Sequence, residues 1–179
     1  MHAIALLGGR VHSRAELERK LCTVLLRRRT TGDARALAAS VCGELEERGL
    51  LDDAAYARWH AAQRDSAAGA PRPRSRAQLT NELYSKGLPA PLVQGAVAGH
   101  SELASCAAAA LRRPTLCGAQ LVSHLQFKGF AYWAVARAAR AREEGGEGAL
   151  RALVEEERAA RAAAAAAAVA EKEGKEELQ

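Results

Sequence analysis

The acidic pair Asp52-Asp53 and the histidines are the residues of this chain most able to do chemistry, because carboxylates and imidazoles serve as acids, bases and metal ligands. The two aspartates directly follow Gly49-Leu50-Leu51, so we interpret Asp52 as a helix N-cap and Asp53 as an acid in the first turn. The histidines show neither an HExxH motif nor other metal-ligand spacing: His2, His12, His60, His100 and His124. We therefore expect neither catalytic residues nor a bound metal.

The cysteines and glycines lead to the same expectation. The cysteines lack CxxC and zinc-finger spacing, and we expect buried thiols in a reducing compartment: Cys22, Cys42, Cys106 and Cys117. Gly8-Gly9 and Gly145-Gly146 are isolated pairs and do not form a phosphate-binding loop. The sequence therefore predicts a protein that is not an enzyme and holds no cofactor.

Basic side chains are the other possible source of function. The 179-residue chain has a net charge of +5, and its excess of Lys and Arg lies before about residue 141. Basic clusters recur at Arg27-Arg28-Arg29, at Arg72, Arg74 and Arg76, and at Arg112-Arg113. Such clusters suit nucleic acid or a nucleoprotein surface, although arginine can also serve only to solubilise helices. The candidate contact residues are Arg72, Arg74, Arg76, Lys86 and Lys128.

Aromatic residues are few and do not alternate with the basic ones. Only 4% of the residues are aromatic, which weakens the case for a platform that stacks single-stranded bases. Trp59 and Trp133 lie on apolar helix faces and are expected in the core.

The elements that must position the basic residues belong to a repeated unit. The segment from Ser75 to Leu79, with Leu83 and Lys86-Gly87-Leu88, is echoed by Ala119-Gln120-Leu121, Leu125 and Lys128-Gly129-Phe130. Its opening also occurs earlier, as Ser13-Arg14-Ala15-Glu16-Leu17 with Leu21. Ser-x-x-Glu/Gln is a capping box, leucines four apart form one helix face, and Lys-Gly followed by an apolar residue ends a helix. In the third copy Cys117 stands at the capping serine, so Thr115 is an alternative cap.

These landmarks predict an all-α protein of helical units that stack on copies of themselves and present an extended surface. Helices are expected near residues 13–28, 33–49, 52–66, 75–87, 90–99, 101–112, 116–129 and 131–143. Gly87 and Gly129 should have positive φ. The predicted core includes Leu79, Leu83, Leu121, Leu125, Phe130 and Trp133.

The repeats divide the chain into four segments. We expect a first repeat with a leading helix at 1–68, a second repeat at 74–113 and a third at 114–157, with an alanine- and glutamate-rich tail at 158–179. The run Glu143-Glu144-Gly145-Gly146 is a plausible break, and beyond Glu157 we expect a solvated, fraying helix. Neither a transmembrane segment nor a signal peptide is expected.

Three groups of residues form a pattern that extends over most of the chain. The most specific group is Leu45, Gly49-Leu50-Leu51-Asp52-Asp53, Tyr56-Ala57 and Arg64. The others are Ala3–Leu7, Arg10 and His12–Leu17 at the start, and later Leu79, Leu83 and Lys86-Gly87 with Gly129-Phe130 and Tyr132. With these residues the chain resembles, over roughly residues 3–140, the RecX family, regulatory proteins that modulate the RecA recombinase. The longer first-repeat turn, Pro89 and the alanine-rich tail depart from the family pattern.

The resemblance implies an all-α protein of tandem three-helix repeats that form an elongated, curved array. This array would lie in the groove of a RecA–DNA filament, contact its DNA backbone, and inhibit or modulate recombination and DNA repair. We expect a monomer. It would be cytoplasmic in a bacterium, or in the stroma or matrix of an organelle in an alga or plant. Two alternatives stay open. Helix–Gly turn–helix units such as 75–97 also resemble a stand-alone helix-turn-helix DNA-binding module, and a helical-repeat scaffold without a nucleic-acid role would show the same periodicity.

Overall fold

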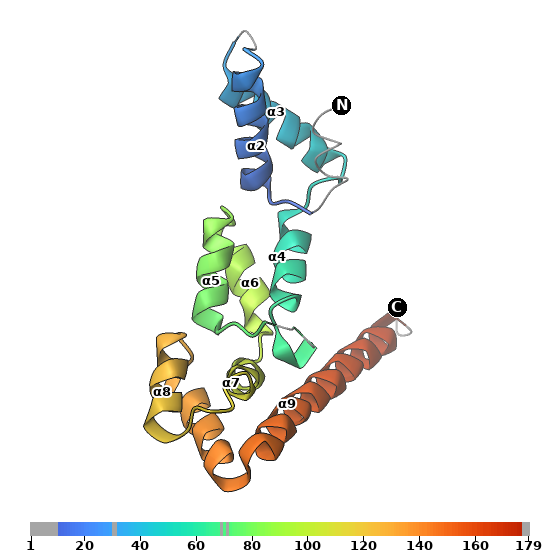
Figure 1. The fold of residues 1–179 in the computed structure, drawn as a ribbon. Helices are drawn as coiled ribbons and strands as arrows, with labels where there is room; N and C mark the ends of the chain where they lie inside the picture. Colours follow the sequence, from blue (N-terminus) through green and yellow to red (C-terminus); the bar gives the residue numbers. More distant parts are fainter. Residues whose placement is uncertain (1–10, 30–31, 69, 71, 177–179) are drawn as a thin grey trace. The chain divides into compact units, whose positions relative to one another are not determined.

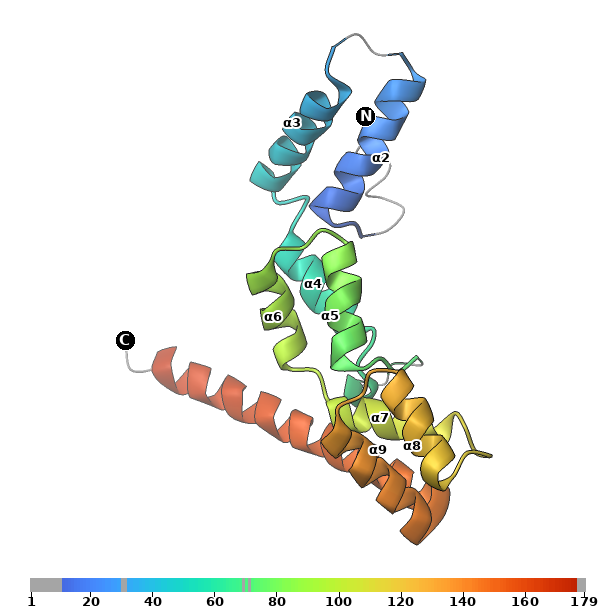
Figure 2. The same cartoon turned by 90° about the vertical axis from the view of Figure 1, so that its left-hand side faces the viewer.

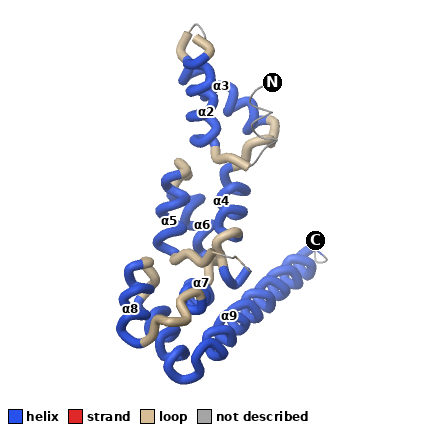
Figure 3. The backbone as a smooth tube through the Cα atoms, in the orientation of Figure 1, coloured by secondary structure: helices blue, strands red, loops and turns tan. Residues whose placement is uncertain are grey.

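The computed structural model describes residues 11–29, 32–68, 70 and 72–176. Over these ranges the chain is helical and holds no β-strand, which confirms the all-α prediction (Figure 3). The expected leading helix around Ala3–Leu7 lies outside the described residues. In chain order (Figure 1) the elements are α2 (Arg14–Arg27), α3 (Ala34–Glu47), α4 (Asp53–Ala62), the 3₁₀ turn η1 (Ser66–Ala68), α5 (Arg76–Ser85), α6 (Ala90–Ala98), α7 (Glu102–Leu111), α8 (Gly118–Phe127) and α9 (Tyr132–Glu176).

The helices recur in threes along the chain, as α2–α4, α5–α7 and α8 with the two halves of α9. Gly146 divides α9, with φ 59° and ψ −137°, at the break expected near this position. The helix expected over 52–66 ends at Ala62 and is followed by η1. The helix expected from 116 begins at Gly118; its N-cap is Cys117, which makes no side-chain cap bond, and not Thr115.

The chain forms two compact units, and a helix contributes to both. The first unit comprises residues 1–61 and 80–98, and the second comprises 62–79 and 99–179, so the boundary falls inside α5. The repeat boundaries expected from the sequence stay a prediction. Among the described residues no helix combines the length and the apolar character needed to cross a bilayer.

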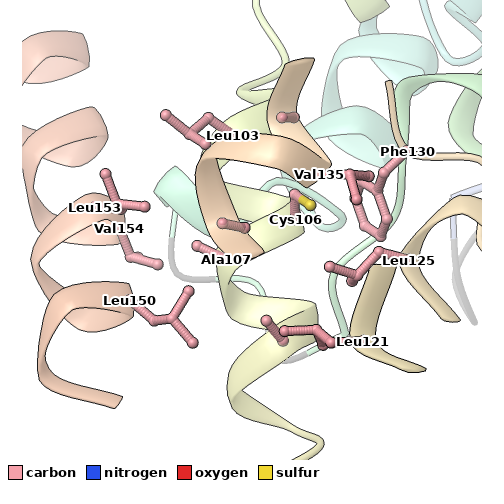
Figure 4. Close-up of a cluster of buried hydrophobic side chains, with 13 residues drawn as sticks. Leu103, Cys106, Ala107, Leu121, Leu125, Phe130, Val135, Leu150, Leu153 and Val154 are labelled. Atoms are coloured by element: carbon pink, nitrogen blue, oxygen red, sulfur yellow. The ribbon is translucent and has the colours of Figure 1, made fainter. Parts of the chain in front are cut away.

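Each unit has its own apolar core. In the first unit α2 and α3 pack side by side (Figure 2), around Leu17, Leu21, Ala38, Cys42, Leu45 and Leu51. In the second unit α7, α8 and both halves of α9 surround a larger cluster (Figure 4), which includes Leu103, Cys106, Ala107, Leu121, Leu125, Phe130, Val135, Leu150, Leu153 and Val154. The five aliphatic and phenylalanine positions predicted for the core are at most 6% exposed, which confirms them.

The two tryptophans were wrongly expected in the core. Trp59 is 47% exposed and Trp133 is 57% exposed. In the first turns of α9 the inward face consists of Ala134, Val135 and Ala138, one position away from Trp133. Because these small residues form the inward face of the helix, Trp133 lies on the exposed side.

The capping serines link each repeat to the next one by the same pair of bonds. Ser13 Oγ accepts the amide of Glu16 (3.2 Å) and donates to the carbonyl of Lys86 (2.6 Å). Ser75 Oγ accepts the amide of Gln78 (3.2 Å) and donates to the carbonyl of Lys128 (2.9 Å). One hydroxyl thus satisfies an orphan amide at one helix start and an orphan carbonyl at another helix end. We call these contacts the first junction (Ser13–Lys86) and the second junction (Ser75–Lys128).

The glycine after each junction lysine is required by both backbone angle and packing. Gly87 has φ 80° and Gly129 has φ 74°, which confirms the two predicted left-handed positions. A Cβ at Gly87 would lie 2.4 Å from the Cβ of Ala15, and one at Gly129 would lie 3.3 Å from Ser75 Oγ. The junction therefore depends on a helix end without a side chain.

After the kink at Gly146, α9 is apolar on one side for only two turns. Leu150, Leu153 and Val154 are buried, whereas residues 158–170 are all exposed, as expected for a solvated helix. One polar contact anchors this exposed stretch. The guanidinium of Arg161 pairs with the carboxylate of Asp65, which is 2% exposed and also accepts the amide of Ala67 (3.0 Å).

Truncation of a core leucine should be costly. We expect Leu83→Ala to lower the free energy of unfolding by about 2–5 kcal/mol, because Leu83 is fully buried. Leu26→Ala is the matched control: Leu26 is 65% exposed, so its loss should change stability by under ~0.5 kcal/mol. Urea titration of both variants measures the difference, and equal midpoints would contradict the assigned core.

The anchor of the tail should be separable from its length. Deletion of residues 159–179 removes Arg161 and leaves Asp65 without this cation, so we expect a loss of about 1–3 kcal/mol. Deletion of residues 166–179 keeps the pair and should leave the urea midpoint unchanged. Arg161→Ala in the full chain should reproduce the longer deletion; if the two deletions are equally stable, the ion pair contributes nothing.

Candidate functional site

A basic groove of about 300 Å³ is the site to which the predicted contact residues lead, and it lies within the second unit. Five of its ten lining residues are Arg or Lys, and no acidic side chain is among them. Its wall comes from three parts of the chain: the segment that leads into α5 with the first turn of α5, the end of α7, and α8 with the turn that follows it. The lining residues are Arg72, Pro73, Arg74, Gln78, Ala109, Arg112, Arg113, His124, Lys128 and Phe130.

The structure brings together three of the five candidate contact residues. Arg72, Arg74 and Lys128 line the groove. Arg76 is not among the lining residues; its guanidinium donates to the carbonyl of His100 at 3.0 Å. Lys86 belongs to the first unit, so it is described separately below.

The other basic residues of the groove were predicted from the sequence only in part. Arg112 and Arg113 were recognised as a basic cluster but were not among the candidate contact residues. His124 was missed as a groove residue, because a lone histidine on a helix carries no local signal of what it faces.

Side-chain contacts to backbone carbonyls hold the basic segments in place. The ring of His100 is buried, and its Nε2 lies 2.9 Å from the carbonyl oxygen of Arg74, the geometry of a donated hydrogen bond. Arg142 donates to the carbonyl of Arg113 at 3.0 Å. These bonds fix the backbone on both sides of the groove, so the arginine side chains project from rigid positions.

Lys86 is held in an ion pair of the first junction. Its Nζ lies 2.6 Å from Glu16 Oε1, and the hydroxyl of Tyr56 donates to the other oxygen of that carboxylate at 3.3 Å. Glu16 is only 9% exposed. A salt bridge to a carboxylate this well buried is a structural contact in the first instance, because the lysine charge is already compensated.

His124 reports the electrostatic potential of the groove. Partial burial is the main cause that lowers its pKa from the ordinary 6.5, and the positive charges of Arg113 and Lys128 lower it further. The imidazole is therefore neutral at neutral pH. The part of this shift that comes from Arg113 and Lys128 reflects a positive potential at His124, which favours negative charge there.

The acidic pair has the capping role expected from the sequence. Asp52 accepts the amide of Ala55 at 2.9 Å, and Asp53 accepts the amide of Arg14 at 2.8 Å. Glu102 does the same for Arg76 (2.6 Å) in the second unit. These carboxylates are engaged with backbone donors, so the arrangement stabilises helix ends and offers no acid–base pair.

The cysteines follow the expectation of buried thiols only in part. Cys42 and Cys106 are buried, and burial raises the pKa of their thiols to about 11 and about 12, so both are protonated. Cys22 is half-buried, and Cys117 is exposed, which contradicts the expectation for that residue. In the part of the chain that the structure describes, no three His, Cys, Asp or Glu side chains gather in a way that could hold a metal ion.

The titration of His124 should reveal the cations around it. We expect its pKa, followed by NMR through the imidazole protons, to lie below 6.5 in the native protein. Arg113→Gln removes a positive charge that disfavours the imidazolium, so the pKa should rise. Arg151→Gln, at an exposed position in the second half of α9, is the control and should leave the pKa of His124 unchanged. If Arg113→Gln also leaves that pKa unchanged, the assigned positive potential of the groove is contradicted.

Comparison with known proteins supports the resemblance seen in the sequence. No family model matches the chain, and no solved structure matches it. A curated relative, the regulatory protein RecX of Chlorobaculum tepidum, is 32% identical over 137 residues, which cover 72% of this chain and 78% of the relative. At that identity and coverage, with an all-helical fold and a repeated Lys-Gly junction, the chain belongs to the RecX family of regulatory proteins.

Proposed function

We propose that this protein binds the filament that a RecA-type recombinase forms on DNA, and that it restrains recombination by occupying that filament. The observation that carries the proposal is the basic groove: five Arg and Lys side chains converge there with no acidic residue in the wall. Membership of the RecX family supports the choice of partner. A basic groove on a rigid helical scaffold suits a nucleoprotein filament, whose DNA carries a regular row of phosphates.

The mechanism that follows is competitive binding without chemistry. Repeated helical units present many weak contacts, and their sum gives affinity for a repetitive partner. A protein that binds one state of the filament better than another shifts the population toward that state. The proposed role needs no cofactor. The protein would act as a monomer in the compartment of its recombinase, the cytoplasm of a bacterium or the stroma or matrix of an organelle.

The candidate contacts have different standing within this proposal. Arg72, Arg74 and Lys128 face the groove and are the strongest candidates. Arg76 borders them and is exposed, although its guanidinium also holds the carbonyl of His100. Lys86 can contribute only a charge that Glu16 already compensates, so we expect its contribution to be the smallest.

The proposal can be tested with the recombinase itself. We expect this protein to lower the DNA-dependent ATP hydrolysis of a RecA-type recombinase, and the inhibition should weaken as salt rises, because the Debye length falls from ~10 Å at 0.1 M to ~3 Å at 1 M. The Arg72→Glu/Arg74→Glu/Arg76→Glu variant should inhibit less. The matched control, Arg35→Glu/Arg58→Glu/Arg151→Glu, has the same change in net charge on exposed residues outside the groove.

The outcomes separate the alternatives. Because Arg76 also donates to the carbonyl of His100, the triple variant could lose stability. Thermal unfolding therefore serves as a control that the variant is folded. Unchanged ATP hydrolysis with the parent protein would contradict the proposal. Sequence-selective duplex binding without any recombinase would instead favour a stand-alone DNA-binding module, and indifference to both DNA and recombinase would favour a scaffold.

A further inference from the structure

The two junctions have the same backbone and differ in one side-chain pair. In both, a buried serine accepts the amide three residues on and donates to the carbonyl of a lysine that precedes a left-handed glycine. The residue three positions after the serine is Glu16 in the first junction and Gln78 in the second. Lys86 and Lys128 therefore occupy equivalent positions but meet different partners.

The difference decides the charge at the second junction. Glu16 compensates Lys86 at 2.6 Å, whereas the side chain of Gln78 is neutral and its Oε1 lies 3.4 Å from the amide of Ser75. Within the described part of the chain Lys128 makes no ion pair, and it lines the groove together with Gln78. An uncompensated ammonium at this position is thus a consequence of one residue type.

We propose that the groove of the second junction is a phosphate-binding site for a nucleic-acid backbone, and that Gln78 in place of a glutamate is what makes Lys128 available to it. This deepens the proposed function by assigning the DNA contact to one unit. Binding of nucleic acid by the groove can nevertheless be measured in the absence of the recombinase, so the two proposals can be tested separately.

The composition of the groove fits phosphate oxygens. Guanidinium groups bind phosphate through two parallel N–H···O bonds, and an ammonium adds a compact charge. Arg72 and Arg113 are exposed at the groove, and like Lys128 they form no ion pair among the residues that the structure describes. Cations that converge without carboxylates repel one another, so an anion that binds between them relieves a cost already present in the free protein.

Shape favours a chain of phosphates over a small free anion. The groove holds about 300 Å³, and exposed residues such as Arg72, Arg112 and Arg113 form part of its wall, so it opens to solvent. An enclosed pocket with converging backbone amides would suit a single phosphate better. An open, basic channel instead tracks a backbone whose successive phosphates each meet a cation.

The decisive variant is Gln78→Glu, which copies the Glu16–Lys86 pair into the second junction. We expect the new carboxylate to engage Lys128 and to weaken binding of a labelled oligonucleotide of about 16 nucleotides, measured by fluorescence anisotropy. Loss of one phosphate contact should make the slope of log K against log salt concentration shallower by about 0.7, the value for a single strand, which is about fivefold in affinity at 0.1 M salt relative to 1 M. The unfolding midpoint should stay level or rise, because an ion pair is gained.

Matched variants keep the interpretation specific. Gln94→Glu makes the same chemical change on an exposed position of α6 and should bind the oligonucleotide like the parent. Glu16→Gln, the reciprocal change in the first junction, should lower stability without weakening binding. Lys128→Gln should show the same loss of affinity and of salt slope as Gln78→Glu.

The proposal is overturned if Gln78→Glu and Lys128→Gln bind the oligonucleotide with the parent's affinity and salt slope. It is also overturned if inorganic phosphate at equal phosphate concentration raises the unfolding temperature of the parent as much as the oligonucleotide does, because the groove would then be a small-anion site. A third outcome separates the two proposals. If Gln78→Glu and Lys128→Gln lose affinity for the oligonucleotide but still inhibit the recombinase as the parent does, the phosphate-binding groove is supported and only its role in the proposed function is contradicted.

Discussion

The rest of the structure depends on one hydroxyl per junction. Ser13 and Ser75 are fully buried, and each satisfies two backbone groups that belong to different helices. A buried orphan amide or carbonyl costs about 1–3 kcal/mol. Each serine therefore holds the start of a helix in one copy against the end of the equivalent helix in the next copy, α2 against α5 and α5 against α8. The glycine that follows the accepting lysine completes the contact. At Gly87 a Cβ would collide with Ala15, at Gly129 it would crowd Ser75 Oγ, and both glycines have positive φ. The hydrogen bond from the serine hydroxyl to the lysine carbonyl therefore also determines where the charged lysine side chain begins.

In each junction the backbone contacts and the charge of the lysine depend on different residues of the same turn. The backbone bonds of the two junctions are alike, yet the glutamate of the first makes its lysine a structural ion pair, and the glutamine of the second leaves its lysine in a basic groove. The hydrogen bonds at the helix starts also differ between copies according to local need. Glu102 accepts the amide of Ala131 at 2.9 Å, whereas the corresponding residue of the preceding copy is Pro89, which has no amide proton and needs no acceptor. Differences between copies thus follow local hydrogen-bonding needs and charge, while the shared contacts keep the fold.

Features encoded within a few residues were predictable from the sequence. Capping serines, leucines four apart and Lys-Gly stops each have a local physical cause, and they located the helices and most of the core correctly. The tryptophans were misplaced because hydrophobicity alone does not show which helix face turns inward. In α4 that face includes Tyr56 and Ala57, and in α9 it includes Ala134 and Val135. Asp65 and Arg161 are separated by 96 residues, and His124 approaches Arg113 only through the fold, so neither relation leaves a pattern in the sequence. The basic groove was predicted in part, since its arginines cluster locally but its walls come from three segments.

The third copy shows why the series of junctions stops. Cys117 stands where serine is needed and makes no side-chain cap bond, and a thiol is too weak a donor to replace a hydroxyl between two backbone groups. The start of α8 is correspondingly exposed at Cys117, Ala119 and Gln120, where the earlier copies bury their serine. Gly146 turns α9, and the second half of this helix brings Leu150, Leu153 and Val154 against the core beside α7. A repeat array needs such a closing element, because an open repeat face would leave apolar surface in water. The groove therefore lies at the last junction that the serine can make, between a copy that continues the pattern and one that ends it.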